Sequence, residues 1–220
     1  MAWSHSSLKA FETCARQYHE VRILKKWPRE TTPEQLYGTE LHKHAEDYIH
    51  AKKPVTESFA FLQPMLDALA AMPGRKLCEV ELAVDVHLQP CGFRDDVAWA
   101  RGIADLLIVD DDNLTARVFD YKTGGNRYPD TDQLDLMALL TFATYPHVRS
   151  VTGGLLFVLK GTVTKHRVER SQAPAMWARY RERIAKEAAA HANGVWNPKQ
   201  SGLCRKHCPV LTCEHNGRNT

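Results

Sequence analysis

Residues 102–107 and 119–124 place carboxylates inside two runs that otherwise favour buried strands. Between them, residues 110–113 have the composition of a tight turn, so the two runs are expected to pair as a hairpin. Charge is costly at positions that a soluble fold normally fills with apolar side chains, unless it is paired or binds a metal. The sequence therefore predicts a sheet that buries charged residues for a chemical purpose.

The acid and the amine near the end of the second run lie on one face of the strand. Side chains alternate along a strand, so Asp120 and Lys122 point to the same side, about 6 to 7 Å apart along the backbone. In the hairpin, Asp105 lies on the neighbouring strand and can converge with Asp120 on one cation, for which oxygen ligands favour Mg²⁺ or Mn²⁺. Lys122 is then placed to orient or deprotonate a water, which suits phosphodiester hydrolysis.

The alternative is that these residues are structural. An isolated Asp-x-Lys triplet is usually a surface ion pair, and an aspartate at a strand end can be a local cap. Here both acids sit in apolar strands, and a Thr-Gly-Gly turn follows Lys122. This context favours the catalytic interpretation.

These segments resemble the PD-(D/E)XK nuclease superfamily, and within it the RecB-like exonuclease branch, which includes AddB and the CRISPR-associated RecB-like nucleases. Residues 4–18 resemble that branch's first helix, and residues 38–46 resemble its histidine motif. The resemblance extends over nearly the whole chain. The metal ligands that it implies are His42, Asp105, Asp120 and the Tyr121 carbonyl. It assigns the catalytic role to Lys122.

Local signals support the position of His42. Thr32, Pro33 and Gln35 form a capping-box pattern that opens a helix running to about residue 51. His42 and Glu46 lie one turn apart on that helix and share a face. The neighbouring histidines at positions 44 and 50 are expected to pack or to face water.

A strand over residues 76–86 supplies another candidate ligand. Glu79 and Glu81 share one face of it, and either can reach the metal. The resemblance favours Glu79, and the alternative for each is a solvated strand face. A helix over residues 131–145 resembles the family's Q-L-x-x-Y motif, which contacts DNA near the active site. Gln133 matches this motif, whereas Met137 replaces the tyrosine and is expected to pack in the core.

The carboxyl-terminal residues are rich in cysteine, and three thiols within ten residues usually indicate a metal. The resemblance adds an early cysteine and implies a [4Fe–4S] cluster that clasps the two ends of the chain. The four expected ligands are Cys14, Cys204, Cys208 and Cys213. Three residues separate Cys204 from Cys208, which departs from the family's C-x-x-C spacing. The alternatives are structural zinc, completed by His207 or His215, and uncoordinated thiols.

Basic residues predict a path for a phosphate backbone, although the net charge is only +3. One group lies on a predicted hairpin and the other on the helix that follows. These residues are Lys160, Lys165, His166, Arg167 and Arg170, and then Arg179, Arg181, Arg183 and Lys186. The alternative for each is an ordinary solvated position.

The chain of 220 residues, 44% hydrophobic, is expected to form a single domain over residues 1–220. Within it, residues 1–30 supply Cys14, residues 33–170 form the core, and residues 173–220 form a helix and the cysteine-rich tail. No leader or membrane-length apolar run is evident, so the expected setting is the cytoplasm, without membrane contact. A reducing compartment favours cysteines as metal ligands rather than disulfides.

The predicted elements alternate in type and indicate an α/β fold, a mixed central β-sheet flanked by helices with a restriction-endonuclease-like core. The expected helices cover residues 6–25, 33–51, 56–71, 131–145 and 173–193. The expected strands cover residues 76–86, 99–109, 114–122, 153–160 and 162–169.

The predicted function is a divalent-metal-dependent DNA exonuclease acting on single-stranded ends in recombination, repair or phage DNA metabolism, with a recombination or helicase partner. Two alternatives remain. One is a structure-specific endonuclease, and the other is a non-catalytic nucleic-acid-binding module with a structural metal clasp.

Overall fold

The structure is a computed structural model of the chain, and it describes all residues except 1, 28–30, 126, 128 and 219–220. The chain divides into two compact units. Residues 1–2 and 31–176 form the first, and residues 3–30 and 177–220 form the second. The expectation that the whole chain is one domain stays a prediction.

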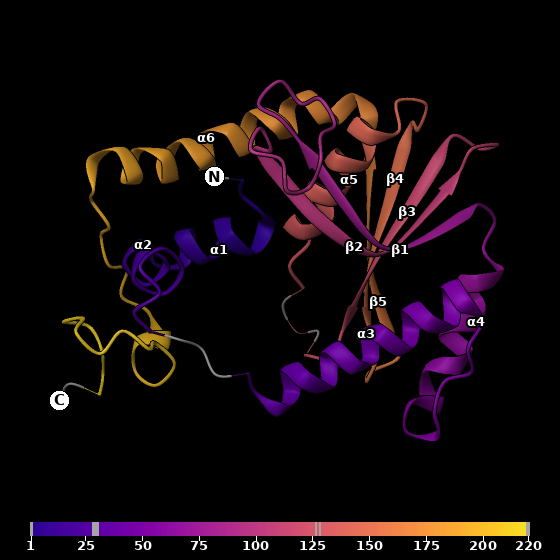
Figure 1. Cartoon of the computed structure of the whole chain (residues 1–220), viewed down its shortest axis with the longest axis horizontal. Coiled ribbons are helices and arrows are strands. Elements are labelled where there is room, and N and C mark those ends of the chain that lie inside the picture. Colours follow the sequence, from indigo (N-terminus) through magenta and orange to yellow (C-terminus); the bar gives the residue numbers. More distant parts are fainter. Residues whose placement is uncertain (1, 28–30, 126, 128, 219–220) are drawn as a thin grey trace. The chain divides into compact units, whose positions relative to one another are not determined.

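The first unit is built on a five-stranded sheet with the order β1-β2-β3-β4-β5 (Figure 1). The strands are β1 (Arg75–Val84), β2 (Ala100–Asp110), β3 (Thr115–Lys122), β4 (Ser150–Phe157) and β5 (Thr162–Glu169). Strands β3 and β4 are parallel, whereas the other neighbouring pairs are antiparallel. The expected mixed sheet and the hairpin of β2 with β3 are confirmed.

Helices cover both faces of this sheet. On one face, α3 (Pro33–Ala51) and α4 (Gln63–Ala71) pack their buried leucines against Leu106, Ile108 and Phe119. On the other face, α5 (Asp132–Thr144) lies close enough to β4 that an added Cβ at Gly153 would meet the Leu134 side chain. Helix α5 carries buried residues on all sides, as expected for a helix in the core.

The start of α3 confirms the predicted cap. Thr32 accepts a hydrogen bond from the backbone N–H of Gln35, and the Gln35 side chain accepts one from the Thr32 N–H, with Pro33 in the first turn. This capping box fixes where α3 begins, and therefore sets which of its residues face the sheet.

The second unit contains both terminal segments. Its helices are α1 (His5–Thr13), α2 (Ala15–Tyr18), a π-helical turn (His19–Ile23) and the part of α6 (Ala173–Asn193) that follows residue 176. The prediction of one continuous helix over residues 6–25 is wrong. Cys14 is extended, with φ −164° and ψ 109°, and its sulfur accepts the Gln17 N–H as the cap of α2. A side chain that caps its own helix interrupts the preceding one.

Two further predicted elements differ from the structure. The helix expected over residues 56–71 begins as a 3₁₀ helix, Glu57–Leu62, before α4. The strand expected over residues 153–160 begins three residues earlier and ends at Phe157. It follows β3 residue for residue in parallel pairing, from Thr115 opposite Ser150 to Lys122 opposite Phe157. The partner strand, rather than local propensity, therefore sets its length.

Within the described part of the chain, no helix combines the length and the apolar character that crossing a membrane requires.

The close approach of α5 to β4 makes a stability prediction. In Gly153→Ala, the new Cβ would lie 2.8 Å from Leu134 Cβ, an atom that no change of rotamer can move away. We expect the free energy of unfolding to fall by about 1–3 kcal/mol, as for other overpacked cores. Urea denaturation measures the change. The control is Gly124→Ala, where nothing lies within 4 Å, and equal stability of both variants would contradict the packing argument.

Candidate functional site

The site lies where the central strands separate. The β2–β3 ladder ends at the pair Leu106 and Phe119, and the next residues toward the site are Asp105 and Asp120. On the other side of β2, the β1–β2 pairing skips Glu79, which lies opposite Asp105. The three carboxylates therefore occupy an interruption in two adjacent ladders, which we call the fork.

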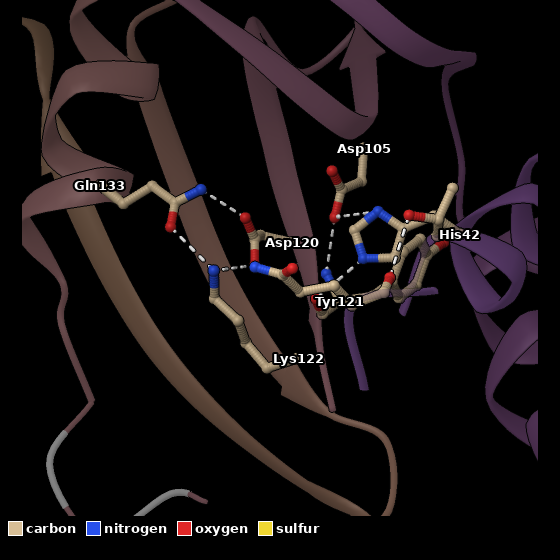
Figure 2. Close-up of polar contacts among 8 residues, drawn as sticks. His42, Asp105, Asp120, Tyr121, Lys122 and Gln133 are labelled. Carbon is tan, nitrogen blue, oxygen red and sulfur yellow. Dashed lines mark hydrogen bonds and ion pairs between the residues drawn. The ribbon is translucent and has the colours of Figure 1, made fainter. Parts of the chain in front are cut away.

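Asp105 is held by backbone and by helix α3. Its Oδ2 accepts the Tyr121 N–H at 2.8 Å and lies 3.5 Å from Nδ1 of His42 (Figure 2). The other ring nitrogen of His42, Nε2, lies 3.1 Å from the Tyr121 carbonyl oxygen. These contacts bring His42, Asp105 and the Tyr121 carbonyl to one point.

Glu79 completes a group of potential metal ligands. Ligand atoms of His42, Glu79 and Asp105 all lie within 4.8 Å of one another, and no other such group of three occurs among the described residues. Glu79 adopts a left-handed backbone with φ +49°, a conformation that costs a non-glycine residue on the order of 1–3 kcal/mol. Such strain often occurs at functional sites, and here it lies at the fork.

A second group lies beside the first. Lys122 Nζ donates to Gln133 Oε1 at 2.9 Å and lies 2.7 Å from Asp120 Oδ2, an ion pair without hydrogen-bond geometry. The Gln133 amide Nε2 donates to Asp120 Oδ1 (Figure 2). Gln133 therefore bridges the acid and the amine from α5. Asp120 lies outside the group of three within 4.8 Å.

The electrostatics of the fork favour a cation. Burial raises the pKa of the Asp105 carboxyl to about 8, and the charge of Asp120 adds to the effect, whereas the Tyr121 N–H opposes it. Partial burial also raises the pKa of Glu79. The charges of Glu46 and Asp120 raise this pKa further, whereas the charge of His42 lowers it. Asp120 Oδ2 is buried without a hydrogen bond. Clustered carboxylates that repel one another are the donors that a divalent oxygen-binding ion needs.

The structure also shows where the other residues named in the sequence analysis lie. Glu81 is exposed and pairs loosely with Arg94 at 3.9 Å, away from the group of three. His44 packs against the Phe59 ring, with centroids 4.5 Å apart. Met137 is buried, as expected. Both ends of the Gln133 amide contact protein groups of the site, a role that its sequence motif did not indicate. Its expected contact with DNA stays a prediction.

Two basic residues of the predicted phosphate path have partners within the fold. The Arg170 guanidinium donates to the backbone carbonyls of Phe142 and Tyr145, at the carboxyl end of α5, and of Val148. Arg183 forms a two-bond ion pair with Glu12, at 2.7 and 2.8 Å. These contacts give both residues a structural role, and their place in a phosphate path stays a prediction.

The four cysteines predicted as ligands line one small cavity in the second unit. They are Cys14, Cys204, Cys208 and Cys213. Burial raises the pKa of the Cys208 thiol, and the nearby sulfurs of the other three raise it further. Backbone N–H groups of Gln17 and Lys199 donate to the Cys14 sulfur at 3.5 Å. His215 lines the same cavity, whereas His207 does not.

Comparison with known proteins assigns the family. The PD-(D/E)XK nuclease superfamily matches residues 2–213, almost the whole chain. The chain belongs to this superfamily. The matched residues include the β2–β3 hairpin, which carries Asp105, Asp120 and Lys122.

Two solved structures resemble this PD-(D/E)XK protein. The first, a "Putative exonuclease" from Eubacterium rectale, has a TM-score of 0.54 and 10% identity, with 97% of this chain and 89% of that one covered. The second, SSO0001, has a TM-score of 0.47 and 11% identity, with 98% and 87% covered. The first likeness supports the fold alone at such low identity. No curated protein matches the sequence.

The raised pKa of Asp105 predicts how stability depends on pH when EDTA removes metal. The native carboxyl keeps its proton to about pH 8, whereas the ordinary value is 3.8. Its stabilising contribution is therefore complete below about pH 4 and is lost as the pH rises to about 8, by at most about 1.4 kcal/mol per pH unit. Asp105→Asn should become more stable than the wild type as the pH rises.

Thermal melts from pH 4 to pH 8 in EDTA measure this difference. Asp110→Asn is the control in the same strand, because a hydrogen bond from Asn113 lowers the pKa of Asp110. That substitution should cost more stability at neutral pH than in acid, the opposite trend. A difference in melting temperature between the wild type and Asp105→Asn that is constant with pH would contradict the raised pKa of Asp105.

Proposed function

We propose that this PD-(D/E)XK protein is a divalent-metal-dependent DNA exonuclease of the RecB-like branch, acting on single-stranded ends. One observation supports it above the others. The fork brings His42, Glu79 and Asp105 within 4.8 Å of one another, beside a lysine held on Asp120. A purely structural ion pair between Asp120 and Lys122 would not require two further carboxylates with raised pKa values, Glu79 and Asp105, beside it.

The proposed metal ligands are His42, Glu79, Asp105, Asp120 and the Tyr121 carbonyl, which would hold Mg²⁺ or Mn²⁺. When bound, such an ion polarises a phosphate and lowers the pKa of a coordinated water. The oxygen-rich donor set fits this ion type. The contact between His42 Nε2 and the Tyr121 carbonyl oxygen orients the imidazole ring. The same contact fixes the histidine and the carbonyl relative to each other.

Lys122 and Gln133 serve the reacting water and phosphate in this proposal. The Lys122 ammonium donates one hydrogen bond to Gln133 Oε1 and forms an ion pair with Asp120. These two contacts fix the lysine in position and leave it with further N–H donors for a phosphate or a water. The positive charge of Lys122 then stabilises the negative charge that develops on the phosphate. Gln133 acts as a positioning residue, since it contacts both partners.

We further propose that the four cysteines bind a [4Fe–4S] cluster, with structural Zn²⁺ as the alternative. The four cysteines line one cavity, and four thiolates are the donor set that such a cluster takes. His215 lines the same cavity, which keeps the zinc alternative open. The N–H donors to the Cys14 sulfur are of the kind that tune such clusters.

The wider setting rests on the resemblance. Single-stranded DNA ends, a cytoplasmic location, a recombination or helicase partner, and roles in recombination, repair or phage DNA metabolism belong to the proposal on that ground. The superfamily itself implies a nucleic-acid substrate.

Cleavage of end-labelled DNA tests the nuclease. Asp120→Asn and Lys122→Met keep the side-chain size but remove a ligand charge or the ammonium, so each should lower the rate by at least about a hundredfold. Single- and double-stranded substrates, with Mg²⁺, Mn²⁺ or EDTA, identify the metal and the strand preference. Asp111→Asn, in the exposed β2–β3 turn, is the control with unchanged activity. A folded wild type without metal-dependent cleavage would overturn the proposal.

The cysteine site has its own test. Protein purified without oxygen should be brown, with a thiolate-to-iron absorption near about 400 nm, and should contain iron and sulfide. Cys208→Ser should lose the colour, whereas Cys91→Ser, outside the cavity, should keep it. Colourless protein with one equivalent of zinc would exclude the cluster and leave the zinc alternative.

A further inference from the structure

A hollow of about 690 Å³ opens on the tail of the second unit, beside two of the cysteines. The residues lining it are Gly202, Arg205, Lys206, His207 and Gly217. The three side chains between Cys204 and Cys208 are all basic and all exposed. None of the described residues that line this hollow is acidic.

The charge around the hollow is not neutralised by the rest of the tail. Residues 202–218 contain Arg205, Lys206 and Arg218 but only one acid, Glu214. The Glu214 carboxylate pairs with Arg16 at 2.6 Å, so its charge is already balanced. The hollow therefore presents a positive surface on a chain whose net charge is only +3.

The backbone around the hollow is fixed. The Leu203 carbonyl accepts the N–H groups of both His207 and Cys208 at 3.0 Å, and the Cys204 carbonyl accepts the Gly217 N–H at 3.1 Å. The Arg218 guanidinium donates to the Lys206 carbonyl. A Cβ at Gly217 would lie 3.0 Å from Arg205 Cα, so glycine permits this close approach. A preformed loop orders its cations before a ligand binds, which lowers the entropic cost of binding.

We propose that Arg205, Lys206 and His207 form a binding site for the phosphate backbone of single-stranded DNA, which we call the tail anion site. The inference rests on the proposed nuclease function, because that function makes a nucleic acid the polyanion at hand. Arg205 and Lys206 supply adjacent positive charges for phosphates, and the His207 imidazole adds a hydrogen-bond donor beside them, so the contact is independent of sequence. It adds affinity without taking part in cleavage.

The test uses Asp120→Asn protein, which should bind DNA without cutting it. Fluorescence anisotropy of a labelled single-stranded oligonucleotide is measured across a salt series. Adding Arg205→Ala and Lys206→Ala should weaken binding about tenfold and reduce the slope of log affinity against log salt by about 1.4, or about 0.7 for each lost phosphate contact. The matched control removes one exposed lysine and one exposed arginine, Lys53 and Arg94, which neither line the hollow nor belong to the predicted phosphate path, and should bind like the parent.

Two measurements separate lost contacts from lost structure. Thermal melts and the metal content of the cysteine site should be the same in every variant, and the exchange pair Arg205→Lys with Lys206→Arg should retain the parent affinity. Unchanged binding by the alanine pair, or an equal loss in the control that removes Lys53 and Arg94, would overturn the tail anion site. If the wild type nevertheless cleaves DNA, the proposed function stands. If the Asp120→Asn parent does not bind DNA and the wild type does not cleave it, both proposals are overturned.

Discussion

The hydrogen bond from the Tyr121 N–H to the Asp105 carboxylate is the contact on which the site depends. In an uninterrupted ladder this N–H would donate to a carbonyl of β2, but the β2–β3 pairing ends before it. The carboxylate replaces the missing acceptor, so the strands can separate without leaving a buried donor unsatisfied. The same bond fixes the acid that the chemistry needs, and thereby joins the stability of the sheet to the geometry of the site.

The fork also explains how two helices on opposite faces of the sheet reach one site. An intact sheet would separate α3 from α5. Where the ladders are interrupted, His42 of α3 contacts Asp105 and the Tyr121 carbonyl, while Gln133 of α5 contacts Asp120. The carboxylates, the Lys122 ammonium and the His42 imidazole are thus held in place by strands and helices rather than by loops. The cost appears as the left-handed backbone of Glu79 and the raised pKa of Asp105.

Much of this arrangement could be predicted from the sequence, because the signals are local. The capping box gave the start of α3 correctly, and the apolar runs with their turn gave the β2–β3 hairpin. Other features depend on tertiary contacts. The end of β4 is set by its pairing with β3, and the bridge made by Gln133 requires α5 to lie beside the fork. The break at Cys14 had a local signal, a side chain able to cap its own helix, which the helical pattern around it obscured.

Counting basic residues overestimates the nucleic-acid surface for a related reason. Arg170 donates to three backbone carbonyls at and beyond the end of α5, and Arg183 is paired with Glu12, so several donors of each are already used within the fold. A cation can bind phosphate only where the fold has not already used its donors. In the tail the opposite holds, since Arg16 pairs with the single acid and the exposed side chains from Arg205 to His207 face solvent. Local pairing, rather than net charge, therefore determines where this chain can bind a polyanion.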